Sequence, residues 1–482
     1  MPAQVLMSAV PKLSSPETGR VALSWKRSDS VMISVLIAAA IVTHLWSLGY
    51  PDEPVFDEIQ FVGQAMAFIR GEQFTCVHPN LGPLLIALAI KVLGFHSWAW
   101  RTPSALLGIA LVPITFLLAR EMFSSRVAGV LAGAFVLFDG MFLVHSRLGM
   151  LEIFYVTFTA ASYLLLFILL RTRDSSAMRR MIVYLAIASG SAMATKLLLP
   201  EIGFLLVVGF LLYDLFSRGS RPGTAGIILV LGSVSGIVYL ATFIPDYWLG
   251  WWGGARALVH YYGEVIFQLR SFGATTNPFV SPWWSWPLML RAPLYWQTRT
   301  DAGLIATIWG GGNPVLWWSS LAALLLTAWK AIRHPALSSA FLLLGYVAYM
   351  LALGLPTHPF YLYIYISPLY LQYIAFAAIL AECWKGAGDP VEHLILIASL
   401  APASLVGLGT GLGILVLSVA IAIYVVVAWR SDLAGKFVCA LIITAALVAF
   451  VYFLPVWVGT PIDPASYENR IWLNSSGLVK WM

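Results

Sequence analysis

The chain has 482 residues, of which 60% are hydrophobic and only 10% are charged, and its mean hydropathy is +0.84. This composition excludes an ordinary soluble domain and indicates a polytopic helical membrane protein. The net charge of +6 comes from segments between apolar stretches, so it reports orientation in the membrane and predicts no nucleic-acid partner.

The first 30 residues are polar and carry Lys12, Arg20, Lys26 and Arg27, which predicts a cytoplasmic tail. The first apolar segment, Val31–Leu48, is followed by no convincing small-residue cleavage site, so we expect an uncleaved first span. The loop over residues 50–80 then lies on the external side.

This external loop is strongly acidic, with Asp52, Glu53, Asp57, Glu58 and Glu72. Carboxylates are costly in lipid, so these side chains must reach water or a polar partner. Asp52 and Pro54 predict a helix start, and Phe61, Ala65 and Phe68 would form the apolar face of a helix lying on the membrane surface. The alternative is a solvated loop that is acidic by chance.

Hydropathy and charge together predict about thirteen transmembrane helices. The expected spans are Val31–Leu48, Pro103–Leu118, Val127–Val144, 152–170, Met181–Leu198, Glu201–Phe216, Ala225–Ile244, Pro314–Thr327, Ser338–Leu355, Phe360–Glu382, His393–Leu408, Leu412–Val427 and Phe437–Leu454. The short segment Leu81–Phe95 is expected to dip into the membrane without crossing it.

The predicted spans form two modules, residues 31–244 and 313–454. Arg171–Arg180 contains four arginines and one aspartate, so this loop is expected to be cytoplasmic. Residues 245–312, rich in Trp, Pro and Gly, are expected to form a second large, non-helical external loop. Residues 455–482 would be an external tail.

Four external features could meet over one cavity. They are Asp57 with Glu58; His78 and the turn leading to Arg101; Asp139 with the run from His145 through Arg147 to Glu152; and the aromatic loop with Trp284, Trp286, Arg291 and Asn313. A carboxylate can accept the proton of an attacking hydroxyl, and cations can hold a phosphate leaving group. Aromatic faces can stack on a sugar ring.

Each feature also has a structural alternative. Arg147 could simply pair with Glu152, and the tryptophans could anchor the loop at the membrane interface, as most such residues do. Arg101, Lys196 and Arg291 could likewise only pair with buried acids. Three cysteines, Cys76, Cys383 and Cys439, show no metal spacing. No cofactor is certain, and a divalent metal is neither indicated nor excluded.

The ordered set of motifs resembles the protein O-mannosyltransferase family, a branch of the GT-C-type glycosyltransferases. The matching pieces are Phe56-Asp57-Glu58, the HPxLG form at His78–Gly82, Arg101–Ala105, Ser146-Arg147 followed by Glu152, Lys196 after Ala194-Thr195, Trp284–Pro287 with Arg291, Gly312–Pro314 with Trp317-Trp318, and Pro455 to Trp472. They occur in family order over nearly the whole chain.

The resemblance implies an all-α GT-C bundle and assigns roles to individual residues. Asp57 matches the catalytic acid of the family, a base for the acceptor hydroxyl, and Glu58 is its structural or orienting partner. Candidates for donor lipid phosphate are Arg101, Lys196, Arg291, Arg147 and His78. Glu152 and Asp139 would form a second acidic site, and Trp284, Trp286, Asn313 and His358 a sugar and acceptor region.

The chain departs from the family pattern at several positions. The family's HPPLGK is HPNLGP here, so Asn80 replaces a proline and Pro83 replaces a lysine. A family arginine corresponds to His358. The second external loop is too short for an inserted carbohydrate-binding trefoil domain, as expected for a prokaryotic member. The missing lysine raises the question of which cation holds the phosphate.

The implied function is inverting transfer of mannose from a polyprenyl (dolichyl-type) phosphate to Ser or Thr hydroxyls of exported, unfolded or translocating proteins. The implied location is the plasma membrane of a prokaryote, among membrane lipids, with the site on the external face. A transferase acting on a lipid or glycan is the alternative within this class. A transporter or flippase is the alternative from another class, disfavoured because the acids lie in external loops and no repeat is evident.

Overall fold

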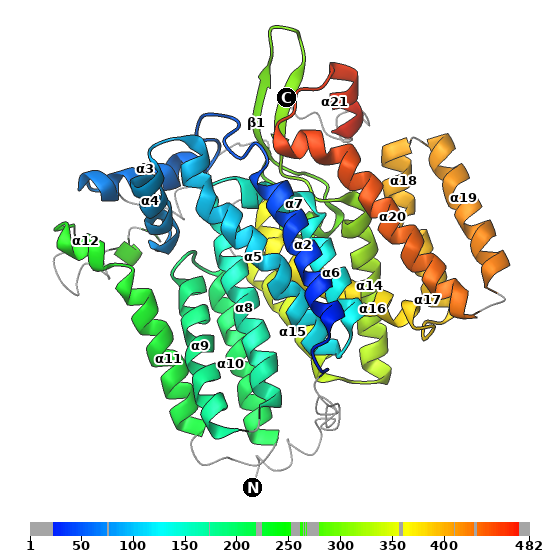
Figure 1. Ribbon diagram of the computed structural model, residues 1–482, viewed down its shortest axis with the longest axis horizontal. Coiled ribbons are helices and arrows are strands. Elements are labelled where there is room, and N and C mark those ends of the chain that lie inside the picture. The colour runs from blue at the N-terminus through cyan, green and yellow to red at the C-terminus, as the bar shows by residue number, and fades with distance from the viewer. Residues whose placement is uncertain are drawn as a thin grey trace.

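The computed structural model describes residues 23–74, 77–172, 174–217, 224–251, 261–263, 265, 267, 279–355, 360–408, 410–428 and 431–471. In this part of the chain the protein is a helical bundle with one small antiparallel hairpin that projects from one end (Figure 1). The end with the hairpin is also the end at which α3 and α4 lie, and it is called the hairpin end below.

The first half of the chain is helical wherever it is described. Its helices are α2 (Arg27–Leu45), α3 (Glu58–Arg70), α4 (Leu81–Leu93), α5 (Ser97–Phe123), α6 (Arg126–Leu137), α7 (Gly140–Arg147), α8 (Leu151–Arg171), α9 (Ser175–Met193), α10 (Leu199–Ser217), α11 (Thr224–Ala241) and α12 (Ile244–Trp248).

The second half contains the hairpin and the remaining helices. These elements are the 3₁₀ helix η2 (Trp283–Leu288), β1 (Leu294–Arg299), β2 (Ile305–Trp309), α14 (Pro314–Arg333), α15 (Leu337–Gly354), the 3₁₀ helix η3 (Leu362–Tyr365), α16 (Ile366–Trp384), α17 (Pro390–Ala398), α18 (Ala401–Leu408), α19 (Thr410–Val427), α20 (Ser431–Val458) and α21 (Pro464–Arg470).

Helices occupy all thirteen positions at which the sequence predicts a span. Within the described residues, eight helices are long and apolar enough to cross a membrane: α2, α5, α8, α10, α14, α15, the η3–α16 segment and α20. The pair α6 and α7, bent by 59°, is a ninth if it forms one span. The fold is therefore a multi-span helical membrane protein, and the figure of thirteen crossings stays a prediction.

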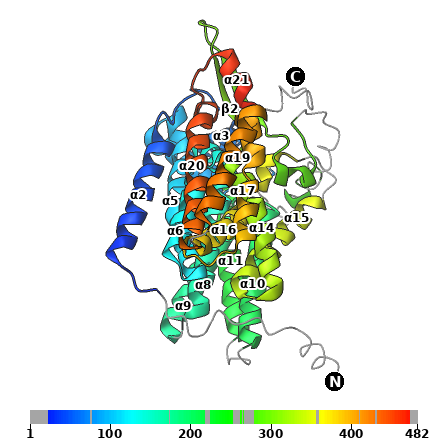
Figure 2. The same cartoon turned by 90° about the vertical axis from the view of Figure 1, so that its right-hand side faces the viewer.

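Helix α16 lies at the centre of the bundle (Figure 2), and nearly all of its side chains are buried. It packs against α14, α6, α15, α20 and α5. A helix that is apolar on all sides is stable only when other helices surround it, so α16 is the axis around which the two halves of the chain assemble.

The loop before α3 differs from the sequence prediction. The helix begins at Glu58 with Asp57 as its N-cap, and not near Asp52. Asp52 Oδ1 instead accepts a hydrogen bond of 2.7 Å from Ser97 Oγ, and Arg101 binds the backbone carbonyl of Glu53. Tertiary contacts thus hold residues 51–56 in an irregular loop that local capping signals alone would have made helical.

Helix α4 fits the expectation of a segment that does not cross the membrane. Its 13 residues span about 20 Å at about 1.5 Å per residue, whereas a hydrocarbon core is roughly 30 Å thick. The expectation of a non-helical second external loop is wrong at its start, because residues 244–248 form α12 and residues 261–263 are helical.

Candidate active site

Asp57 lies at the start of α3, partly buried beneath the hairpin end of the bundle. Tyr363 Oη donates a hydrogen bond of 3.0 Å to Asp57 Oδ2. Burial, with a smaller contribution from the negative charge of Glu152, raises the pKa of Asp57 to about 6 against the opposing effects of the Lys196 cation and the Tyr363 hydroxyl. A carboxylate whose pKa lies near neutral can serve as a general base.

Glu152 and Lys196 form a buried ion pair beside Asp57. Glu152 is at the first turn of α8, and Lys196 precedes α10; Lys196 Nζ contacts Glu152 Oε1. The same ammonium nitrogen lies 5.4 Å from the centre of the Tyr363 ring. These four residues, Asp57, Glu152, Lys196 and Tyr363, are called the Asp57 cluster below.

The His78–Gly82 turn packs against the segment that carries Lys196. The Leu81 amide donates a 3.0 Å hydrogen bond to the carbonyl of Ala194. A Cβ at Gly82 would lie 2.3 Å from Leu151 Cδ2, so a larger residue here would force the Leu151 side chain to move. Burial and the nearby charge of Lys196 hold the pKa of His78 well below its usual value, so this imidazole is neutral.

Aromatic side chains surround the cluster, but they are not the tryptophans that the sequence indicated. Phe56 lies 4.7 Å from Tyr295 and 5.9 Å from Tyr361, measured between ring centres. His145 Nε2 is 2.9 Å from Tyr295 Oη. Sequence reasoning missed Tyr295, Tyr361 and Tyr363, although tyrosines at 361, 363 and 365 at the start of an apolar span were a usable signal.

Arg101 and Glu58 form a second, fully buried ion pair. The Arg101 Nε and one terminal nitrogen each contact Glu58 at 2.9 Å. Its remaining donors bind the backbone carbonyls of Leu48, Pro51 and Glu53. Arginine has five N–H donors. All five are engaged in fixing the loop before α3, so none is left for a lipid phosphate in this arrangement.

Arg147 also serves the backbone. Its guanidinium donates to the carbonyls of Thr43, His44, Trp46 and Ser47, at and just beyond the C-terminal end of α2, where helix carbonyls lack intrahelical donors. Arg147 therefore caps α2. The alternative pairing of Arg147 with Glu152 is not found, because Glu152 pairs with Lys196.

Asp139 and Asn313 form a junction away from the Asp57 cluster. Asp139 Oδ1 caps α7, and Asp139 Oδ2 accepts hydrogen bonds from the backbone N–H of Asn313 at 2.7 Å and from Tyr373 Oη at 2.8 Å. Asn313 in turn caps α14 and donates to the carbonyl of Ala446. The structure does not bring Asp139 together with Glu152 as one acidic site.

The remaining predicted site residues lie in or near the second loop. Trp286 is buried and bound to Ser281, whereas Trp284 is exposed. Arg291 donates to the carbonyl of Val280. His358 lies outside the described residues. Within the described part of the chain, no group of three or more His, Cys, Asp or Glu side chains is placed to hold a metal ion.

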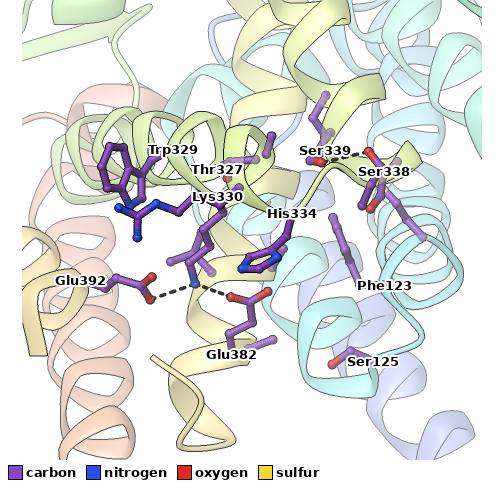
Figure 3. A pocket seen from close by; sticks show the side chains of 18 of the residues that line it. Phe123, Ser125, Thr327, Trp329, Lys330, His334, Ser338, Ser339, Glu382 and Glu392 are labelled. Carbon is purple, nitrogen blue, oxygen red and sulfur yellow. Dashed lines mark hydrogen bonds and ion pairs between the residues drawn. The ribbon is translucent and has the colours of Figure 1, made fainter. Parts of the chain in front are cut away.

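A second polar region lies at the far ends of α14 and α16. Lys330 Nζ contacts Glu382 at 2.6 Å and Glu392 at 2.9 Å (Figure 3), beside a cavity of about 640 Å³. The α14 residues that line this cavity begin at Thr327, so it lies roughly 20–30 Å along the helix from Pro314, the first residue of α14. Of the described residues that the sequence indicated as a site, none lines it.

The helical bundle, with a partly buried carboxylate at its hairpin end, has the fold of the GT-C membrane glycosyltransferases, as two solved structures show. The protein O-mannosyltransferase Pmt1-Pmt2 complex of S. cerevisiae, solved with its sugar donor, has a TM-score of 0.74 to this chain at 12% identity, covering 95% of this chain and 94% of that chain. ArnT of Cupriavidus metallidurans, bound to undecaprenyl phosphate, has a TM-score of 0.57 at 16% identity, covering 93% of this chain and 78% of its own.

Three family models match in succession along the chain. Residues 33–100 and 77–258 match dolichyl-phosphate-mannose-protein mannosyltransferase models, and residues 255–476 match the C-terminal four-transmembrane region of protein-O-mannosyltransferase. The chain belongs to the protein O-mannosyltransferase family. This membership places it among enzymes and sets aside the transporter alternative.

Curated relatives agree with this assignment. A polyprenol-phosphate-mannose–protein mannosyltransferase of Mycobacterium tuberculosis is 23% identical over 519 residues, covering 92% of this chain and 90% of the relative. The enzyme of the same name from Corynebacterium glutamicum is 24% identical over 537 residues, covering 94% of both.

Proposed function

We propose that the protein transfers mannose from a polyprenyl phosphate mannose to Ser or Thr hydroxyls of exported proteins, with inversion at the sugar carbon. Family membership supports the donor class and the protein acceptor. The single structural observation that carries the proposal is the Asp57 cluster, in which a carboxylate with a pKa of about 6 lies beside the Lys196 cation and the Tyr363 ring.

In the proposed step, Asp57 removes the proton from the acceptor hydroxyl as its oxygen attacks the anomeric carbon of mannose. The bond between that carbon and the phosphate oxygen breaks on the opposite face, and the electron pair leaves with the polyprenyl phosphate. Attack from the face opposite the leaving group inverts the configuration. Asp57 ends protonated and returns its proton to water.

Lys196 is our candidate for the phosphate contact. A developing phosphate charge in a partly dry pocket must be offset by a cation already in place. Lys196 has three donors, of which one contacts Glu152, and it lies over the Tyr363 ring in the Asp57 cluster. It can therefore take over the role of the family lysine that Pro83 replaces, whereas Arg101 is occupied by Glu58 and the backbone.

We further propose that the Asp57 cluster faces the outside of a prokaryotic plasma membrane, where translocating acceptor chains emerge. Three helices that run from the hairpin end toward the other end of the bundle have a basic residue in their last turn: Arg120 in α5, Arg171 in α8 and Arg333 in α14. Basic residues are retained on the cytoplasmic side. The opposite end, with Asp57 and the hairpin, is then external.

The proposal is tested with the purified protein in lipid vesicles, radiolabelled polyprenyl phosphate mannose and a Ser/Thr-rich peptide. We expect label on the peptide hydroxyls. A parallel reaction offers a lipid or glycan acceptor in place of the peptide. Label found on that acceptor alone would contradict the proposal and favour the alternative within the superfamily.

A further inference from the structure

The β1–β2 hairpin is attached to the Asp57 cluster at its base. Tyr295, the second residue of β1, contacts His145 and packs on Phe56, the residue before Asp57. The next residue, Trp296, donates a 2.7 Å hydrogen bond from Nε1 to Glu53 and packs on the Tyr50 ring. The strand therefore runs from the cluster outward, away from the bundle (Figure 1).

The outer edge of β2 is already covered by the chain itself. The Ile305 amide donates to the Ile462 carbonyl at 2.8 Å, and the Ile462 amide donates to the Ile305 carbonyl at 2.9 Å. The backbone polar groups of Ile305 hence point away from β1. This contact ties one side of the hairpin to the segment between α20 and α21.

Because Ile305 directs its backbone groups away from β1, the register of the hairpin determines which backbone groups of β1 point outward. Arg299 is the register partner of Ile305, and Gln297 is the partner of Thr307. In an antiparallel ladder, residues alternate between pairs bonded to each other and pairs whose N–H and C=O point to the outer edges. Arg299 and Gln297 therefore present their backbone groups to the outer edge of β1.

This outer edge is open in the described part of the chain, where the sheet has two strands only. The side chains of Gln297, Thr298 and Arg299 are exposed. An unpaired strand edge is a template for another extended chain, and peptide-binding proteins use such edges to hold ligands through main-chain hydrogen bonds.

We propose that an extended segment of the acceptor protein pairs with the outer edge of β1, through the backbone groups of Gln297 and Arg299. This inference rests on the proposed function, since it assumes a polypeptide acceptor. Gln297 is two residues from Tyr295, about 7 Å along a strand. If an acceptor segment is paired with this edge, a Ser or Thr a few residues farther along the acceptor reaches the Asp57 cluster. Because only backbone atoms are recognised, the pairing imposes little preference for the acceptor sequence.

The decisive test is a scan of the acceptor peptide by backbone N-methylation, using the wild-type enzyme. N-methylation removes one amide donor at a time. We expect the acceptor KM to rise about threefold to tenfold at alternate positions on one side of the target Ser or Thr, the range set by one lost hydrogen bond. Positions between them should change little, and kcat should stay constant.

A uniform response or none along the peptide would overturn the strand-pairing inference while leaving transfer to peptides intact. Failure of the unmethylated peptide to accept mannose would instead contradict the proposed function. The two failures are therefore distinguishable in one series of reactions.

Variants of the hairpin give an independent measurement. Proline is tolerated on an edge strand where the lost N–H faces outward. R299P should raise the acceptor KM and leave donor-lipid affinity unchanged. The matched control is Thr298→Ala, which keeps every backbone donor and should leave the acceptor KM unchanged. An R299P enzyme with an unaltered acceptor KM and an unaltered melting temperature would contradict the inference.

Discussion

Tyr363 donates a 3.0 Å hydrogen bond to Asp57 across a separation of 306 residues. This contact joins the start of α3 to the segment before α16, the central helix of the bundle. The base proposed for the reaction is therefore held by the element on which the rest of the fold packs. Its protonation state depends on a partner from the other half of the chain.

The pH dependence of transfer should report Asp57. Burial and the charge of Glu152 raise the pKa of Asp57 to about 6, and only the deprotonated form can accept a proton. Activity should therefore be full above this value and fall as pH drops through it. In Tyr363→Phe, a hydrogen bond that stabilises the carboxylate is lost. The pKa of Asp57 should therefore rise, and the fall in activity on the acidic side of the pH profile should move to higher pH. A pH profile of kcat/KM, which reports the free enzyme, measures the shift for both proteins, and identical profiles would contradict the assignment.

Asp57→Asn should abolish transfer. The amide has nearly the shape of the carboxylate but cannot accept the hydroxyl proton, and loss of a general base lowers rates by about 10²–10⁴. Donor-lipid affinity and melting temperature should stay close to those of the wild type. Glu72→Gln is the matched control, because Glu72 is exposed and belongs to the same acidic loop. Retention of more than about a third of the rate in Asp57→Asn would exclude the role.

Arg101→Gln and Glu58→Gln should act chiefly on stability. Each leaves one charge of a fully buried pair without its partner, which costs roughly 3–5 kcal/mol. Arg101→Lys should not restore the lost stability, because lysine cannot reproduce the two-pronged contact with Glu58 and three carbonyls. Detergent melting and lipid-phosphate affinity should be measured on the same preparations. A loss of donor affinity at an unchanged melting temperature would return Arg101 to the list of phosphate contacts.

Lys196→Gln should reduce both turnover and donor-lipid binding, with a loss in rate on the order of 10²–10³, as for removal of a charge-stabilising donor. Lys196→Arg, which keeps the positive charge, should retain part of the activity. Because the Lys196 cation lowers the pKa of Asp57, the acidic limb of Lys196→Gln should also move to higher pH. An unchanged affinity for the donor in this variant would mean that another residue holds the phosphate.

The orientation of the bundle can be measured with single cysteines. Glu72 and Ser175 are both exposed, near opposite ends of the bundle. In a background with Cys76 replaced by serine, Glu72→Cys should react with an impermeant thiol reagent from outside intact cells. Ser175→Cys should react only after permeabilisation. Equal labelling of both positions from outside would overturn the proposed topology.

Several features of this protein follow from its sequence alone. Long apolar segments separated by basic turns are sufficient to predict a helical membrane protein, because a continuous apolar segment of this length satisfies its own backbone hydrogen bonds in hydrocarbon by forming a helix. The acidic loop and the ordered motifs also predict Asp57 as the candidate base and the family, whose models match along the chain. These inferences depend on local composition and order, which a sequence contains in full.

Only the tertiary structure distinguishes the roles of the charged residues. Arg101, Arg147 and Lys196 are equivalent in sequence as cations near external turns. In the folded chain Arg101 fixes a loop, Arg147 caps α2, and only Lys196 reaches the Asp57 cluster. The sequence offers the alternating tyrosines 361, 363 and 365 as a signal, but only the folded chain shows that Tyr363 is the one bound to Asp57. The reason is physical: the partner of a buried charge is set by the packing of helices distant in sequence, and that packing determines which donors remain available for a substrate.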